Sequence, residues 1–253
     1  MNTVKIRNIV IGEGMPKICV PIVGTTKEEL LQEVEALQNL SVDIVEWRMD
    51  WFKEIENLDA AKEMVKTLRE ALKDTALLAT FRSKKEGGEL EVSTEYYIAL
   101  NKAIVDSGCA DLIDVELFTG ETEVNDIVTY AHEHGVKVIM SNHDFDKTPS
   151  YDEILTRLKA MQSLDADIPK IAVMPTCKKD VLTLLQATNE MHETYADRPI
   201  ITMSMAGTGV ISRLCGEVFG SALTFGAAKK ASAPGQMNVE DLHTVLTLLH
   251  KSL

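Results

Sequence analysis

The stretch DIPKIAVMP, residues 167–175, places a lysine near the start of an apolar run that ends in proline. Short apolar runs of this kind are typical of buried strands. Because side chains alternate between the two faces of a strand, Ile171 and Val173 share one face, and Lys170 and Ala172 share the other. Lysine is almost never fully buried without a partner or a chemical task. The fold must therefore explain why a cation stands in this strand.

Similar β-rich runs recur along the chain and alternate with longer amphipathic stretches. Eight of them start about 20 to 35 residues apart, a spacing that suits successive strand–helix units. They cover residues 17–23, 42–49, 76–82, 110–117, 136–142, 169–175, 199–205 and 220–226. Between them, apolar residues recur at three- and four-residue spacing, which predicts helices. The predicted helices cover residues 26–40, 58–73, 93–108, 151–164, 178–195 and 239–253, and a further one ends before Gly135.

Two local signals support the predicted helix boundaries. Thr26 followed by Glu29 has the spacing of a capping box at the start of a helix. Gly135 lies just past the end of the fourth predicted helix, where a glycine C-cap is common. The chain contains no long linker or low-complexity tract that would separate two domains.

Eight strand–helix alternations in 253 residues fit the (β/α)8 TIM barrel by count and by length. The expected architecture is a single (β/α)8 barrel domain over residues 1–253, with a short N-terminal hairpin at residues 3–12 that closes the barrel bottom. The competing architecture is a doubly wound open sheet, which usually needs fewer strands and carries a dinucleotide fingerprint. GEGMPK at residues 12–17 lacks the third glycine of that fingerprint and does not open a helix.

Composition and charge narrow the classes of function. Hydrophobic residues make up 45% of the chain and charged residues 26%, and no run approaches the roughly 18 apolar residues of a membrane span. The N-terminus lacks the apolar core of a signal peptide, so a cytoplasmic location is expected. The net charge of −13 argues against nucleic acid as a partner, and an anionic substrate would need a local cluster of cations. The four cysteines form no CxxC pair and are expected to be reduced thiols.

Several charged residues are predicted to point into the barrel near the C-terminal ends of their strands. Glu46 and Arg48 share one strand face, Arg82 ends the third run, and Asp114 and Glu116 share a face of the fourth. Barrel enzymes carry their active sites at this end. Any one of these charges could be a structural ion pair, and the two acids could simply neutralise nearby cations. Together with a lysine they favour a functional site, because each buried ion costs several kcal/mol before it is paired.

His143 differs from the other five histidines because it follows the apolar strand VKVIM, in the motif SNHDF, whereas the others lie in predicted helices. Its place at the C-terminal end of a strand suits acid–base chemistry. No HExxH or paired His–carboxylate spacing indicates a metal site. An unprotonated lysine is a nucleophile toward ketones and forms a Schiff base. The residues therefore predict a metal-free, lysine-dependent barrel enzyme that acts on a carbonyl compound.

Six motifs, in order and with family-like spacing, resemble type I 3-dehydroquinate dehydratase. They are EWRMD (46–50), TFRSKKEGGE (80–89), SNHDF (141–145), IPKIAVMP (168–175), GVISR (209–213) and SAPGQ (232–236). The resemblance covers nearly the whole chain. It implies a homodimeric (β/α)8 barrel without a cofactor. The implied reaction converts 3-dehydroquinate to 3-dehydroshikimate and water in the shikimate route to aromatic amino acids.

The resemblance also implies a role for each catalytic residue. Lys170 would attack the C3 ketone and form the imine. His143 would serve the proton transfers of imine formation and hydrolysis, take the C2 proton and assist departure of the C1 hydroxyl. Glu86 would hold His143 in the right tautomer and orientation, as the third group of a triad does.

The implied substrate-binding residues come from four of the six motifs. They are Glu46, Trp47, Arg48, Arg82, Arg213, Ser232 and Gln236. Arg213 would pair with the substrate carboxylate through its planar fork. Ser232 and Gln236 would belong to a loop over residues 229–238 that closes on the substrate. Trp47 comes with the EWRMD motif, although strand alternation turns it toward the opposite face from Glu46.

The chain departs from the family pattern at two places, and two rival functions stay open. Pro21 stands where some members have a serine near the substrate, and Ala206-Gly207 stands where a lysine-containing pair often occurs. One rival is another Schiff-base barrel, such as a class I aldolase whose AGTGV segment (206–210) binds a sugar phosphate. The other is a non-catalytic barrel that binds a small carboxylate.

Overall fold

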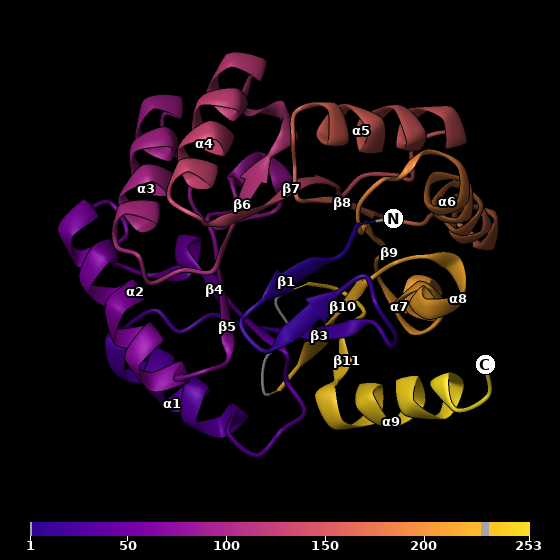
Figure 1. The fold of residues 1–253 in the computed structure, drawn as a ribbon, viewed down its shortest axis with the longest axis horizontal. Helices are drawn as coiled ribbons and strands as arrows, with labels where there is room; N and C mark the ends of the chain where they lie inside the picture. The colour runs from indigo at the N-terminus through magenta and orange to yellow at the C-terminus, as the bar shows by residue number, and fades with distance from the viewer. Residues whose placement is uncertain (1, 229–232) are drawn as a thin grey trace.

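The computed structural model describes residues 2–228 and 233–253, in which parallel strands form a barrel surrounded by helices (Figure 1). The barrel strands are β3 (Lys17–Ile22), β4 (Ile44–Arg48), β5 (Ala76–Thr80), β6 (Leu112–Glu116), β7 (Lys137–Asp144), β8 (Ile168–Val173), β9 (Ile201–Ser204) and β10 (Leu223–Ala227). Neighbours along the chain pair in parallel, and β10 pairs back with β3. A bridge between Ile200 and Ser221 joins β9 to β10 and closes the ring. The predicted (β/α)8 barrel is thereby confirmed.

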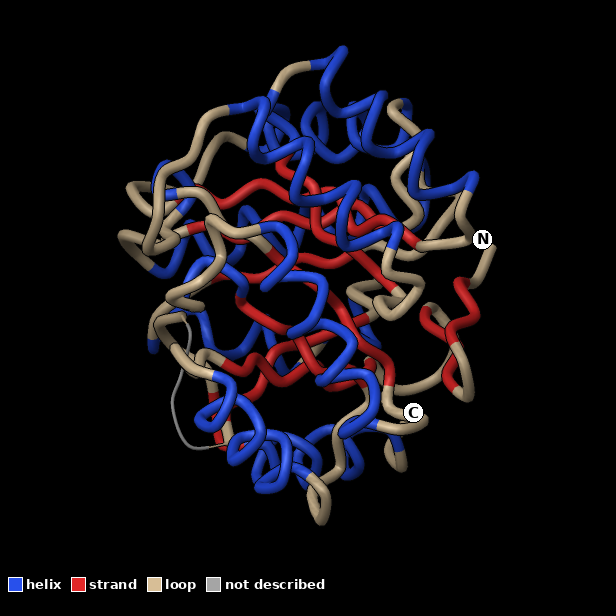
Figure 2. The backbone as a smooth tube through the Cα atoms, turned by 90° about the vertical axis from the view of Figure 1, so that its left-hand side faces the viewer, coloured by secondary structure: helices blue, strands red, loops and turns tan. Residues whose placement is uncertain are grey.

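Helices cover the outside of the barrel, as Figure 2 shows for the helices above and below the strands. They are α1 (Lys27–Leu37), α2 (Leu58–Leu72), α3 (Thr94–Asp106), α4 (Glu121–Glu133), α5 (Tyr151–Ser163), α6 (Lys178–Glu190), α7 (Val210–Leu214), α8 (Gly216–Phe219) and α9 (Val239–His250). The predicted helix at 178–195 is α-helical only to Glu190, and a π-helical turn follows. None of the helices in the described ranges has the length and hydropathy of a membrane span.

The two predicted cap signals differ in outcome. Thr26 caps α1, because its side chain accepts a hydrogen bond from the amide of Glu29 at 3.3 Å. The carboxylate of Glu29 bonds to Thr25 instead of Thr26, so only half of the capping box forms. Gly135 has a φ of 74°, the left-handed conformation that glycine adopts without a Cβ clash, and it follows the end of α4 as predicted.

Strand alternation separates the core into two layers. Outward side chains such as Val45, Ile113 and Ile171 pack against the helices in one cluster. Inward side chains such as Ile44 and Leu112 fill the barrel in the other. This is the packing that two-residue periodicity dictates when a sheet closes on itself.

An N-terminal hairpin, β1 (Val4–Ile6) with β2 (Ile9–Ile11), closes the bottom of the barrel as predicted. Val4, Ile6 and Ile11 are buried in the inner cluster, among the side chains at the N-terminal ends of the strands. Arg7 in the hairpin turn pairs with Asp111 at 2.7 Å and so ties the hairpin to the barrel.

Aspartates at the starts of alternate strands link the strands in pairs. The residues are Asp43, Asp111 and Asp167, and each accepts a hydrogen bond from a main-chain amide near the start of the preceding strand, at 2.7, 2.8 and 2.8 Å. The donors are Ile18, Leu77 and Val138. The bottom of the barrel is therefore held by structural contacts, which leaves the C-terminal ends of the strands for the site.

Candidate active site

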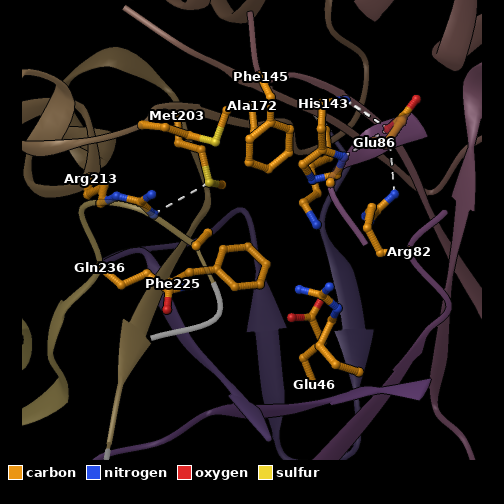
Figure 3. Close-up of a pocket in the computed structure, with 15 residues that line it drawn as sticks. Glu46, Arg82, Glu86, His143, Phe145, Ala172, Met203, Arg213, Phe225 and Gln236 are labelled. Atoms are coloured by element: carbon orange, nitrogen blue, oxygen red, sulfur yellow. Dashed lines mark hydrogen bonds and ion pairs between the residues drawn. The ribbon is translucent and has the colours of Figure 1, made fainter. Parts of the chain in front are cut away.

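Most of the predicted site residues line one cavity at the C-terminal ends of the strands (Figure 3). The cavity encloses about 490 Å³ of empty space, including its open mouth. The lining residues are Glu46, Arg48, Arg82, Glu86, Gly87, His143, Phe145, Lys170, Ala172, Met203, Met205, Arg213, Phe225, Ala233 and Gln236. The cavity therefore gathers charged and apolar side chains from several barrel strands around one space.

Lys170 points into the barrel from β8 and is only 2% exposed. Its Nζ lies 3.2 Å from Oδ2 of Asp114 and 4.7 Å from the centre of the Phe225 ring. Ala172 lies two residues further along the same face, and its small side chain leaves space above the amine. The buried cation is thus held by one carboxylate and one aromatic face, while its amine borders the cavity.

Arg82 joins the acids of the neighbouring strand to the lysine site. Its Nη2 donates to Asp114 at 2.7 Å, and its Nη1 donates to Glu116 and to Ser141 at 2.9 Å each. Burial opposes the charge of Asp114, but Arg82 and Lys170 outweigh it and hold the pKa of this carboxyl below its usual value. Asp114 and Glu116 therefore do neutralise cations, and one of those cations is Lys170.

His143 is held from behind by Glu86, which ends the 3₁₀ turn Lys84–Glu86 after β5. Oε2 of Glu86 lies 3.0 Å from Nδ1 of His143 and accepts a bond from the main-chain amide of His143 at 2.9 Å. The remaining ring nitrogen, Nε2, is the one left for substrate chemistry. Figure 3 shows the ring of His143 at the cavity with Glu86 behind it.

Burial shifts the pKa values of His143 and Glu86 in opposite directions. Burial, reinforced by the charges of Arg82, Lys170 and Arg48, lowers the pKa of His143 well below its usual value. Burial raises the pKa of Glu86 to about 7, although Arg82 pulls it down. At neutral pH the imidazole is therefore an uncharged base, next to an acid that titrates in the same range.

Arg213 is a buried cation that has no acidic partner among the described residues. It is 2% exposed and forms no ion pair with the residues that the structure describes. Its Nη2 donates to the carbonyl of Pro234 at 3.2 Å, and its Nη1 lies 3.5 Å from the sulfur of Met203. Burial lowers the pKa of Arg213 to about 10, so it remains charged at pH 7. An unpaired cation in a cavity is an anion-binding group.

Glu46 and Arg48 form the wall contributed by β4. Arg48 is held by two parallel bonds to Asp50, at 2.8 and 2.7 Å, which fix the plane of its guanidinium. Glu46 accepts a hydrogen bond from Thr80 at 2.9 Å. Both side chains are buried and border the cavity, so the wall presents one anion and one cation to a ligand.

Trp47 corrects one expectation, because it does not line the cavity. Its ring is fully buried on the outer face of β4, where it packs edge-to-face against Phe52 with centroids 5.9 Å apart. The motif carried Trp47 into the predicted site, but strand alternation turns it toward the helices. Ser232 lies outside the described residues.

Four apolar residues of the cavity were missed in the sequence. They are Phe145, Met203, Met205 and Phe225. Alternation on the last two strands could have identified Met203, Met205 and Phe225, which share the inward faces. Phe145 follows the end of β7 and carries no such signal.

The two departures from the family pattern lie at the edge of this site. Pro21 faces Glu46 in the strand register but does not border the cavity. Ala206 has φ 55° and ψ −179°, a conformation that is rare outside glycine, and its amide bonds to Pro234 at 3.2 Å. The helix after the AGTGV segment, α7, is only five residues long.

Within the described ranges, His, Cys, Asp and Glu form no group of three that could hold a metal.

Three comparisons with known proteins match the same enzyme family over nearly the whole chain. A family profile for type I 3-dehydroquinase matches residues 18–253. The curated 3-dehydroquinate dehydratase of Salmonella agona (strain SL483) is 60% identical over 252 residues, which are 100% of each chain. The solved type I 3-dehydroquinate dehydratase of Clostridium difficile, with covalently modified comenic acid, is 58% identical with a TM-score of 0.97 and covers 100% of this chain and 99% of its own. That of Geobacillus kaustophilus HTA426 is 39% identical with a TM-score of 0.96 and covers 99% and 97%.

Proposed function

Since the chain belongs to the type I 3-dehydroquinase family and is a hydro-lyase, we propose that it dehydrates 3-dehydroquinate through a Schiff base on Lys170. The observation that carries this proposal is the shared cavity of a buried lysine, an uncharged histidine and an arginine that has no acidic partner in the described part of the chain. The structure of the Clostridium difficile relative contains covalently modified comenic acid, which supports a covalent step in the proposed reaction. Neither rival, the aldolase nor the passive carboxylate binder, accounts for the family membership.

Imine formation begins with proton transfer from Lys170. Only an unprotonated amine can attack the C3 carbonyl carbon, so a base must take a proton from Lys170 first. In this proposal Nε2 of His143 accepts that proton and passes it to the C3 oxygen after the attack. A second proton then moves from the carbinolamine nitrogen through His143 to the same oxygen, which leaves as water when the C=N bond forms. Asp114 then faces the positive charge of the protonated imine.

Elimination follows on the imine. His143 removes the C2 proton, and the electron pair moves toward the iminium nitrogen, which spares the reaction a free carbanion. The C1–O bond then breaks, and His143 returns its proton to the departing hydroxyl. Hydrolysis of the product imine consumes one water and frees Lys170. Two waters are released and one is consumed, so the sum is the loss of one water.

Substrate binding follows from the charges around the cavity. Arg213 pairs with the substrate carboxylate, and Figure 3 shows it across the cavity from His143. Glu46, Arg48 and Arg82 contact the ring hydroxyls from the opposite wall. Gln236 completes the cavity from the loop before β11 (Met237–Asn238), and Ser232 is proposed to act with it. In this proposed binding mode the ketone, and not the carboxylate, lies over Lys170.

Reductive trapping tests the covalent step. Borohydride added with 3-dehydroquinate should inactivate the protein and leave a reduced adduct on the peptide that contains Lys170. Lys170→Met is the control and should gain no mass. If the wild-type protein turns over substrate but gains no mass under these conditions, the Schiff base is refuted while the dehydratase activity stands.

We also propose that the protein is a homodimer that feeds the shikimate route. Exposed apolar side chains lie on helices that contact one another in pairs, α6 with α8 and α7 with α9: Leu182 at 65%, Ile211 at 49%, Val218 at 52% and Leu248 at 61%. Exposed groups of this kind often mark an interface. Sedimentation should give a dimer for the wild type and a monomer for Val218→Asp; a wild-type monomer would refute the proposed homodimer.

Rescue of a dehydratase-deficient bacterium without aromatic amino acids would test the pathway.

A further inference from the structure

We infer that Asn142 and Arg157, neither of which lines the substrate cavity, are positioning residues that hold Glu86 against His143. This inference rests on the proposed role of the Glu86–His143 pair. Neither was predicted as a site residue, since Asn142 alternates out of the barrel and Arg157 lies on a helix. Their effect is transmitted through hydrogen bonds and involves no contact with substrate.

The carboxylate of Glu86 is clamped from both faces of β7. Its Oε2 bonds to the ring and main chain of His143, as described above, while its Oε1 accepts a hydrogen bond from Nδ2 of Asn142 at 3.1 Å. Asn142 is 4% exposed and immediately precedes His143. Because Glu86 stands on a turn and not in a strand, these bonds determine the orientation of its carboxylate plane. Loss of the Asn142 bond would free Oε1 and allow the carboxylate to rotate.

Arg157 determines which way the Asn142 amide points. Its Nη1 donates to Oδ1 of Asn142 at 2.8 Å. A guanidinium has donors and no acceptor, so only the carbonyl end of the amide can face it. The NH2 end must then face Glu86, where a donor is required. Without Arg157 the amide could turn over and present its oxygen to the carboxylate, which would repel it.

Arg157 is itself held in place from α5. It pairs with Glu153 one helical turn earlier at 2.8 Å, and its guanidinium lies 5.4 Å from the centre of the Phe118 ring. Its side chain is 16% exposed, so the bond to Asn142 is shielded from water. The chain of contacts therefore runs from a surface helix to the catalytic histidine.

A second cavity explains why Glu86 needs the hydrogen bonds that Asn142 and Arg157 provide. It lies next to the substrate cavity and is lined by Glu86, Asn142, His143 and Arg157, among others. Glu86 and His143 border both cavities, so they form the partition between them. Water in the second cavity would compete for Oε1 of Glu86 if the amide donor were absent.

The hydrogen bonds from Asn142 and Arg157 should also affect the pH dependence of the reaction. The charged groups that face Glu86 are Arg82, Glu116 and His143, and Arg157 acts through Asn142. Burial holds the pKa of Glu86 near 7, and the Asn142 bond lowers it because that bond favours the carboxylate. Removing the donor raises this pKa, so the acid limb of the kcat profile should move to higher pH.

Kinetics of Asn142→Ala and Arg157→Met test the inference. Each should lower kcat about 10- to 100-fold, the range seen when partners behind a catalytic group are removed. KM should change less than about twofold, because neither residue borders the substrate cavity. Lys102→Met, which breaks an exposed ion pair with Asp126, is the matched control and should leave kcat, KM and the pH profile unchanged.

Two further readouts separate positioning from mere stability. In a Glu86→Gln background, Asn142→Ala should have little further effect on kcat, since its action passes through Glu86. The NMR titration of the His143 ring, measured without substrate, should shift in Asn142→Ala. Wild-type kcat and pH profile in a folded Asn142→Ala or Arg157→Met would overturn the inference, as would a full additional loss in the Glu86→Gln background. Failure of the proposed function would show separately, as a wild-type protein without dehydratase activity.

Discussion

Replacing Arg213 by methionine should weaken substrate binding and at the same time stabilise the ligand-free protein. Arg213 is buried and has no acidic partner among the described residues, and its pKa of about 10 lies below the ordinary 12.5. Each pKa unit corresponds to about 1.4 kcal/mol, so the charged form costs about 3 kcal/mol in the fold. The folded protein binds this proton more weakly than the unfolded chain, so the cost applies at every pH below about 10.

The expected gain is smaller than this full amount. Methionine loses the bond from the charged Arg213 guanidinium to Pro234, about 1.5 kcal/mol, and a weaker contact with the sulfur of Met203. Urea unfolding at pH 7 without ligand should therefore show a stabilisation of about 1 to 2 kcal/mol. The lost pairing with the substrate carboxylate should remove about 2 to 4 kcal/mol of transition-state binding, or roughly 30- to 1000-fold in kcat/KM.

Arg82→Met is the matched control, because Arg82 is equally buried but fully paired. Its loss leaves Asp114 with Lys170 alone and Glu116 without an ion-pair partner among the described residues, so the protein should be destabilised by about 3 to 5 kcal/mol. The reasoning is refuted if Arg213→Met destabilises the ligand-free protein as much as Arg82→Met does. It is also refuted if Arg213→Met keeps the wild-type kcat/KM.

The remaining predictions concern the pH dependence of activity and stability, the loop around Gly235 and the strained residue Ala206. The kcat of the wild type should fall below about pH 7 as Glu86 is protonated, and a pH-rate profile of Glu86→Gln should lack this inflection. Because the folded-state pKa of Glu86 is raised, its ionisation destabilises the fold as pH rises through about 7, so unfolding of Glu86→Gln should depend less on pH between 5 and 8. Gly235→Ala should raise KM severalfold while the melting temperature changes little, since Gly235 has φ 80° and an added Cβ would lie 2.4 Å from the carbonyl oxygen of Ala206; an unchanged KM would contradict this docking of the loop. Ala206→Gly should leave KM unchanged and alter the unfolding free energy by less than about 1 kcal/mol, because relief of its φ of 55° is offset by the greater freedom of glycine in the unfolded chain.

The sequence alone determined the barrel and the direction of most site residues. Periodicity of two residues follows from the covalent geometry of a strand, so Lys170 and Glu46 could be assigned to the inside before any contact was known. The same rule identified Trp47 correctly as outward, and the prediction failed where the motif was preferred to the alternation. The hairpin at the barrel bottom was likewise predicted from its apolar pattern.

Only the tertiary structure decided which charges meet. Asp114 pairs with Lys170 across 56 positions of sequence, and Glu86 reaches His143 across 57. Arg213 emerged as the buried cation that receives no acid among the described residues. Alternation gives the face of a side chain, whereas an ion pair depends on distances of 3 to 4 Å that exist only after the ring of strands has closed. The inward direction of Lys170 could therefore be predicted from the sequence, whereas its partners depend on closure of the barrel.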